Sequence, residues 1–334
     1  MFNFKKFIGF SWTGFIPPQY LLANKRFRKV VLEPPDYNPG SWQGAGKVLV
    51  DYENHEFWLT SRPRRARPVR GYAIQIYRSK NGEDYSLETT ITREELKEQT
   101  KLNILSIEGQ QLLKDPATGK YYLYVSIDID HPPIPGWDTF LLTADDPKGP
   151  WTPHGLVLTR EYPYEVKEAR DSVIDIIDGR YIALYKANNG SRVNVALAVS
   201  SDGLKWEKMG ILKLNGLNQP HYLFISGRIF AGTLHPIFIG FETRHVVRGG
   251  GYTGTFVAYY VNLRELDLKT LYKGVWKPES PYERKDYPVH GYCDIVYDPF
   301  KERFLIYVEA VDPNSELGLD YEVDRLILYE VPLS

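Results

Sequence analysis

Two acidic residues, Glu108 and Asp171, occupy equivalent positions of a recurring pattern in this chain of 334 residues. Each lies seven residues before a tight turn that joins two apolar segments, and these turns begin at Asp115 and Asp178. Two carboxyl groups held close together can act as a general acid and a general base, because their proximity pushes their pKa values apart. One group then gives a proton to a leaving oxygen while the other activates water.

The same pattern occurs five times. The other turns begin at Asp51, Ser226 and Asp298, and counting back seven residues from them gives Gly44, Gln219 and Gly291. Regularly repeated strand pairs are typical of repeat-built β-propellers, in which equivalent positions surround one axis. We therefore predict an all-β fold, a five-bladed β-propeller with a central channel, whose mouth carries Glu108 and Asp171.

The segments on either side of the turns are short and rich in β-branched and aromatic residues, which favours strands over helices. Helical periodicity is clear only in the short segment Arg93–Glu98. No linker rich in glycine, serine or proline divides the chain, so we expect one domain over residues 1–334. The N-terminal segment, with Arg28–Leu32, is expected to close the ring against the C-terminal blade, which includes Leu326–Val331.

Three outer segments add a family resemblance: Tyr77-Arg-Ser-Lys-Asn-Gly-Glu-Asp-Tyr85, Ala144-Asp-Asp-Pro-Lys-Gly-Pro-Trp-Thr152 and Val199-Ser-Ser-Asp-Gly-Leu-Lys-Trp206. They resemble outer-strand signatures of the five-bladed glycoside hydrolases of families 43 and 32 and of the family 130 mannoside phosphorylases. The resemblance implies a glycoside hydrolase that cleaves a glycosidic bond with a pair of carboxylates at the channel mouth. It leaves the sugar, the anomer and the stereochemical outcome open.

Family 43 implies particular roles for these positions: a base on the first blade, a residue that tunes pKa on the second and an acid on the third. Glu108 and Asp171 match the second and third positions, with the residue types exchanged. Gly44 stands at the first position and departs from the family, so either the base comes from elsewhere or the roles differ. Two alternatives stay open: a phosphate-dependent glycoside phosphorylase, and a non-catalytic carbohydrate- or protein-binding propeller.

Further candidates lie near these positions or where the second strand of each blade returns to the same face. The predicted substrate-binding residues are Gln43, Arg62, Arg64, Arg170, Lys186, Gln219, His221, His235, Glu242, His290 and Glu309. Five arginines fall within Arg62–Arg70, a density suited to gripping a phosphate, a uronate carboxylate or an acidic neighbouring chain. The family resemblance implies an oligosaccharide or glycoside as the main partner.

Composition excludes several other classes of protein. A net charge of −1 lacks the basic footprint of a nucleic-acid binder, and no apolar run is long enough for a membrane helix. A single cysteine excludes a disulfide framework, and the N-terminal Lys5–Ile16 segment lacks a cleavage site, so we expect a cytoplasmic protein. No nucleotide-binding motif is present, and we expect no cofactor. A structural calcium ion in the channel and a homo-oligomer remain open alternatives.

Overall fold

The computed structural model describes residues 17–130, 135–232, 234–244, 246–247, 251–252, 255–286 and 289–333. Most of these residues are in β-strands, as the sequence predicts, and two short helices accompany the strands. Helix α1 (Pro18–Asn24) was not expected from the sequence. Helix α2 (Arg93–Thr100) begins at Thr92, whose side chain forms a capping box with Glu95.

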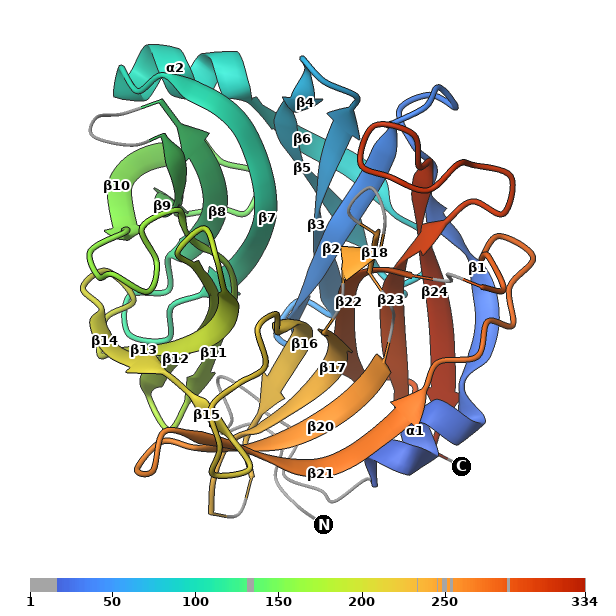
Figure 1. The fold of residues 1–334 in the computed structure, drawn as a ribbon. Coiled ribbons are helices and arrows are strands. Elements are labelled where there is room, and N and C mark those ends of the chain that lie inside the picture. The colour runs from blue at the N-terminus through green and yellow to red at the C-terminus, as the bar shows by residue number, and fades with distance from the viewer. Residues whose placement is uncertain are drawn as a thin grey trace.

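Antiparallel pairing groups most strands into sets of four (Figure 1). The first set contains β2 (Trp42–Asp51), β3 (Glu56–Arg65), β5 (Ala73–Ser79) and β6 (Ser86–Thr92), and the short β4 (Arg70–Gly71) also pairs with β3. The second contains β7 (Ile104–Lys114), β8 (Tyr121–Ile129), β9 (Gly136–Ala144) and β10 (Thr152–Leu158). The third contains β11 (Glu168–Ile177), β12 (Arg180–Asn188), β13 (Val193–Ser200) and β14 (Glu207–Ile211).

Two further sets complete the sequence of strands. The fourth contains β16 (Phe224–Phe230), β17 (Ile237–Thr243), β20 (Thr255–Asn262) and β21 (Asp267–Val275), with β15 (Lys213–Leu214) alongside β21. The fifth contains β22 (Val289–Asp298), β23 (Arg303–Val311), β24 (Asp324–Pro332) and, from the other end of the chain, β1 (Arg26–Leu32). The short strands β18 (Val246–Val247) and β19 (Gly251–Tyr252) pair only with each other.

The first strands of the five sets contact one another in a cycle. Strand β2 contacts β7, which contacts β11; β11 contacts β16, β16 contacts β22, and β22 contacts β2 again. Figure 1 shows these strands around the centre of the molecule, with later strands of each set farther out. The cycle brings residues from distant parts of the chain to a common centre.

Five apolar clusters fill the spaces between neighbouring sets. Between the first and second sets, for example, Ile76 of β5 belongs to the same buried cluster as Leu123 of β8. Between the third and fourth sets, Leu184 of β12 belongs to the same cluster as Phe238 of β17. Alternating side chains of each sheet face such clusters, so the sets support one another from both sides.

β-Bulges interrupt four of the five innermost strands near the positions found by counting back from the turns. The register shifts lie between Gly44 and Lys47 in β2, Glu108 and Gln110 in β7, and Arg170 and Val173 in β11. The fourth lies between Val289 and Cys293 in β22. A bulge turns a side chain away from the regular pleat, so the repeated sequence position marks a repeated backbone irregularity.

One predicted turn was wrong. Ser226 and Gly227 lie inside β16, and the connection to β17 follows Phe230 instead. Gly227 is needed for close packing of strands, because a Cβ there would lie 2.2 Å from the carbonyl oxygen of Ile239. The other four turns are confirmed, since β2, β7, β11 and β22 end at or next to the predicted turn residues.

Candidate active site

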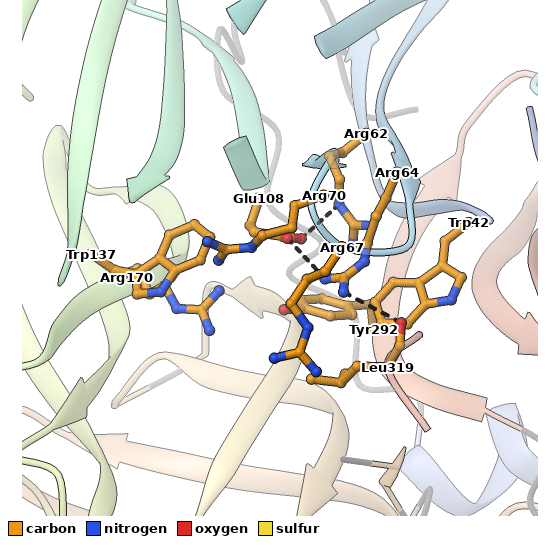
Figure 2. A pocket seen from close by; sticks show the side chains of 10 residues that line it. All are labelled: Trp42, Arg62, Arg64, Arg67, Arg70, Glu108, Trp137, Arg170, Tyr292 and Leu319. Carbon is orange, nitrogen blue, oxygen red and sulfur yellow. Dashed lines mark hydrogen bonds and ion pairs between the residues drawn. The ribbon is translucent and has the colours of Figure 1, made fainter. Parts of the chain in front are cut away.

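A cavity of about 390 Å³ opens among the innermost strands at the end where β2, β11 and β22 begin. Its lining consists of Trp42, Arg62, Arg64, Arg67, Arg70, Glu108, Trp137, Arg170, Tyr292 and Leu319. Figure 2 shows the Glu108 carboxylate between guanidinium groups, with Trp42 and Trp137 on opposite sides. We refer to this cavity as the arginine pocket.

The lining is assembled from four of the five strand sets. Innermost strands supply Trp42, Glu108, Arg170 and Tyr292, whereas Arg62 and Arg64 stand at the end of β3, where the hairpin returns to the same side. The connections add side chains too, because Arg67 follows β3 and Leu319 precedes β24. Arg70 begins β4 and Trp137 is the second residue of β9.

Glu108 is buried between two arginines. Its Oε2 lies 2.9 Å from Nε of Arg62, its Oε1 accepts a hydrogen bond from Nη1 of Arg64 at 3.2 Å, and Ser106 donates to Oε1 at 3.3 Å. Burial alone would raise the pKa of Glu108, but the charges of Arg62 and Arg64 outweigh burial and lower this pKa below its ordinary value. Glu108 is therefore ionised and suited to accepting a proton or facing a positive charge.

Asp171 lies beside the arginine pocket rather than in its lining. It lines a smaller space of about 10 Å³, and Tyr292 is shared by both. The Tyr292 hydroxyl donates to Oδ2 of Asp171 at 3.1 Å, and Ser126 donates to Oδ1 at 3.3 Å. Arg170 lies 3.3 Å from Oδ2. The structure thus places Tyr292 between the Asp171 carboxylate and the larger cavity.

The family resemblance implies a carboxylate at the position of Gly44. The space beside Gly44 holds the side chain of Glu309, one of the predicted substrate-binding residues. A Cβ on Gly44 would lie 2.0 Å from Oε2 of Glu309, which enters from β23 and accepts a hydrogen bond from the Ala45 amide at 2.5 Å. Glu309 is fully buried and is 3.9 Å from Nη2 of Arg62. A carboxylate is therefore present at the first position, but it comes from the fifth strand set and lies outside the pocket lining.

Of the predicted substrate-binding residues, Arg62, Arg64 and Arg170 line the arginine pocket. Lys186 lies close behind it, where its Nζ is 2.8 Å from Oε2 of Glu168, a carboxylate that also pairs with Arg170. Burial would raise the pKa of Glu168, but Arg170 and Lys186 together hold this pKa far below its ordinary value. Lys186 therefore helps to position Arg170 through a shared carboxylate.

The remaining predicted residues lie outside the lining of the arginine pocket. Gln43 donates to Gln75 and Ser61, and Gln219 bonds to the backbone of Val195 and Leu212. Glu242 pairs with Arg244 and Lys273, His221 is exposed, and His235 packs its ring near Tyr260. His290 belongs to β22, but its side chain lies outside the described residues.

Sequence reasoning did not single out Trp42, Trp137, Tyr292 and Leu319 as site residues. Tyr292 directly follows the counted position Gly291, so that signal was available. Trp137 is the second residue of the third strand in its set, and nothing in the sequence separates it from a core tryptophan. In the structure its ring is approached by two guanidinium groups, with Arg170 at 4.1 Å and Arg70 at 5.1 Å from the ring centre.

Within the residues that the structure describes, no group of three or more His, Cys, Asp and Glu side chains is arranged to hold a metal ion. The described helices are likewise too short or too polar to cross a membrane.

Comparison with known proteins identifies solved structures with a similar fold. No protein-family model and no curated protein sequence matches the chain. Among solved structures, a thermostable family-43 glycoside hydrolase is similar at 13% identity and a TM-score of 0.60, over 90% of this chain and 91% of that one. The family 117 glycoside hydrolase Zg3597 of Zobellia galactanivorans is similar at 16% identity and a TM-score of 0.57, over 92% and 91%.

A phosphorylase shares the same architecture. The β-1,2-mannobiose phosphorylase of Listeria innocua, solved with β-1,2-mannobiose, has 13% identity and a TM-score of 0.60, over 93% of this chain and 97% of that one. Identities this low show the fold alone. The chain has a glycoside hydrolase-like propeller fold, as the sequence resemblance implied.

Proposed function

We propose that this protein is a glycosidase, a single-domain five-bladed β-propeller whose arginine pocket binds and cleaves a glycoside. Five strand sets and a cycle of contacts between their first strands support the blade number and the central channel. The observation that carries the functional proposal is a cavity of about 390 Å³ at the common centre, with the ionised Glu108 in its lining. This volume lies within the range of about 300–1,000 Å³ that is typical of small-molecule sites.

The proposed reaction is hydrolysis, in which water attacks the anomeric carbon and the leaving oxygen receives a proton. Glu108 takes the proton of the attacking water or stabilises the positive charge that develops on the sugar. Because Glu108 is ionised, the proton for the leaving oxygen comes from another group. We assign it to Asp171 in its protonated form: the Tyr292 hydroxyl, 3.1 Å from Oδ2, gives its proton to the leaving oxygen and takes the Asp171 proton in return. The proton that Glu108 removes from water balances the one that Asp171 loses.

Two other functions have specific support. The arginines of the pocket suit an inorganic phosphate, which a phosphorylase would use in place of water. The ion pairs of Glu108 with Arg62 and Arg64 suit a non-catalytic sugar-binding propeller, since they give this carboxylate a structural role. In all three functions the bound partner is a sugar.

The test is a panel of aryl glycosides assayed with and without phosphate. Release of the aryl group without phosphate is expected for the glycosidase, whereas strict dependence on phosphate would show phosphorolysis. Tyr292→Phe removes the proposed proton path and is expected to lower kcat by about a hundredfold or more. Binding of sugars with no turnover of the panel would favour the non-catalytic function.

A further inference from the structure

The arginine pocket is unusual for a site that takes neutral sugars. Its ten lining residues include five arginines, whereas Glu108 is the one acidic residue among them. The charge of Glu108 is already shared by Arg62 and Arg64. The charged groups that face the cavity are therefore mostly cationic, while their partner carboxylates lie behind the lining, and low-dielectric surroundings strengthen the attraction of the facing groups for an anion.

Carboxylates behind the lining hold several of these arginines in place. Asp320 binds Arg67 with an Nη2 to Oδ2 distance of 2.6 Å, and Asp128 binds Arg70 at 2.7 Å. Neither acid belongs to the pocket lining. A guanidinium carries five N–H donors in a rigid fork, so a carboxylate behind it uses some donors and leaves others for the cavity.

Arg62 provides the most direct sign of a missing acceptor. Its side chain is fully buried, and its Nε and Nη2 atoms form ion pairs with Glu108 at 2.9 Å and Glu309 at 3.9 Å, whereas Nη1 has no hydrogen-bond partner within the described residues. The Nε atom of Arg64 also lacks a hydrogen-bond partner there. Buried donors are nearly always satisfied, so a ligand with several acceptor oxygens would complete these groups.

The tryptophans of the pocket hold arginines rather than offering open faces to a sugar. The guanidinium carbon of Arg64 lies 4.1 Å from the centre of the Trp42 ring, and that of Arg170 lies 4.1 Å from the Trp137 ring. Figure 2 shows the two stacked pairs on opposite sides of the cavity. Stacking fixes the planes of the guanidinium groups before a ligand arrives, which lowers the entropy cost of binding.

We propose that the arginine pocket recognises a sugar that carries an oxyanion, either a uronic acid carboxylate or a sulfate ester, rather than a neutral sugar. This inference names the substrate class of the proposed glycosidase and rests on the pocket being its site. Both groups present two or more oxygens to a guanidinium fork, so they share one recognition chemistry.

Calorimetric titration of the whole protein distinguishes the two sources of the oxyanion. The probes are methyl glucuronide, glucose 6-sulfate, the uncharged methyl glucoside and inorganic phosphate. At least one of the two charged sugars is expected to bind a hundredfold or more tightly than methyl glucoside, with an affinity that falls as salt increases. Whichever charged sugar binds more tightly identifies the carboxylate or the sulfate.

Two arginines on either side of one turn, at the end of β3 and the start of β4, give a matched pair of variants. Arg70 lines the pocket, whereas Arg65 does not, and the Arg65 side chain is 52% exposed and pairs with Asp36 at the surface. Arg70→Ala is expected to weaken binding of the charged sugar about tenfold or more, the loss of one charge-assisted contact. Arg65→Ala is expected to leave it unchanged. If Arg70→Ala is poorly folded, Arg67→Ala provides a second test, because this lining side chain is 69% exposed.

Three outcomes overturn the inference: equal affinity for charged and neutral sugars, an equal loss in both variants, and phosphate binding as tight as that of the charged sugar. The last result would indicate a site for free phosphate. Failure of the proposed function has a different signature, namely tight binding of the charged sugar with no turnover of its aryl glycoside. Turnover of neutral glycosides without preference for charged ones would instead retain the glycosidase and exclude the charged substrate.

Discussion

Glu108 shows how a single carboxylate can be both a candidate for chemistry and a part of the framework. Its side chain is nearly buried, and both of its oxygens face guanidinium groups. An unpaired arginine at this depth would lower the free energy of unfolding, because a buried charge without a partner loses its hydration and gains no ion pair in exchange. Glu108 is therefore expected to matter for stability as well as for turnover.

The variant Glu108→Gln tests both roles. Turnover is expected to fall by about a hundredfold to ten-thousandfold, and the free energy of unfolding by roughly 3 kcal/mol, because Arg62 loses its nearest counter-charge. The pKa of Glu108 is lowered on folding, so its contribution to stability is present above the unfolded value near ~4.3 and is lost as the pH falls further. The stability difference between wild type and variant should therefore shrink below about pH 4.

Urea unfolding at several pH values measures this effect, with Glu53→Gln as the control. Glu53 forms an exposed ion pair with Lys114, so its replacement should change stability by less than about 0.5 kcal/mol at any pH. Wild-type turnover in Glu108→Gln would contradict the catalytic role and favour a sugar-binding protein.

At the scale of strands, Gly44 in β2 and Glu309 in β23 depend on each other. A side chain at Gly44 would overlap the Glu309 carboxyl group, whose Oε2 would lie 2.0 Å from the new Cβ. Gly44→Ala should therefore displace Glu309 and destabilise the protein by about 1–3 kcal/mol. Gly46→Ala is the matched comparison, since its Cβ would meet the end of the apolar Leu326 side chain, 2.7 Å from Cδ2, instead of a carboxylate.

Thermal melting of both variants checks this contact between β2 and β23. The larger loss is expected for Gly44→Ala. Equal melting temperatures for the two variants would mean that Glu309 moves aside at no cost, and that the space beside Gly44 is not reserved for its carboxylate.

Away from the arginine pocket, a titrating carboxyl group lies between two innermost strands, β11 and β16. Burial raises the pKa of Asp175 in β11 to about 6, although Arg228 in β16 opposes this shift with an Nη1 to Oδ2 distance of 3.8 Å. The folded pKa exceeds the unfolded value of about 3.9, so the contribution of this group is full below that value. It is lost as the pH rises through about 6.

Asp175→Asn removes this titration while leaving an oxygen to accept the Ile176 amide. Relative to wild type, the variant should gain stability as the pH rises from about 4 to 6 and then keep a constant advantage. Urea unfolding across this range measures the difference. A difference that does not vary with pH would show that Asp175 titrates at its ordinary value in the folded protein.

For the whole molecule, the two ends of the described chain meet in one sheet. Strand β1 pairs with β24, and β24 is bridged to β2 through Asp324 and Trp42. Removing residues 1–32 would leave one edge of β24 unpaired and would also remove Leu21, which is buried in the cluster between the fourth and fifth sets. Exposed strand edges promote association with other chains.

The truncated protein is therefore expected to melt at a lower temperature and to aggregate. Leu21→Ala is the control for apolar burial alone: it should cost about 2–5 kcal/mol but leave β1 paired and the protein monodisperse. Light scattering and thermal melting distinguish the two effects. A monodisperse truncated protein with unchanged melting would mean that β1 contributes little to the fold.

The local features of this protein follow from short stretches of its sequence. Propensity, periodicity and capping predict the alternating apolar strands, four of the five turns and the helix after Thr92. These three properties depend only on residues that are close together in the sequence. Four of the counted positions lie at β-bulges, which the sequence did not predict. The Ser226 prediction failed because a glycine required for strand packing looks the same in sequence as a glycine in a turn.

Which side chains meet depends on the packing of the whole molecule. Trp137 reaches the arginine pocket from the second strand set, and Glu309 from the fifth set fills the space that Gly44 leaves empty. Asp171 stands behind Tyr292, although its position in the repeat is equivalent to that of Glu108. Such contacts join residues that are far apart in the chain, and their geometry depends on how whole strand sets pack around the centre, which no local pattern of residues encodes.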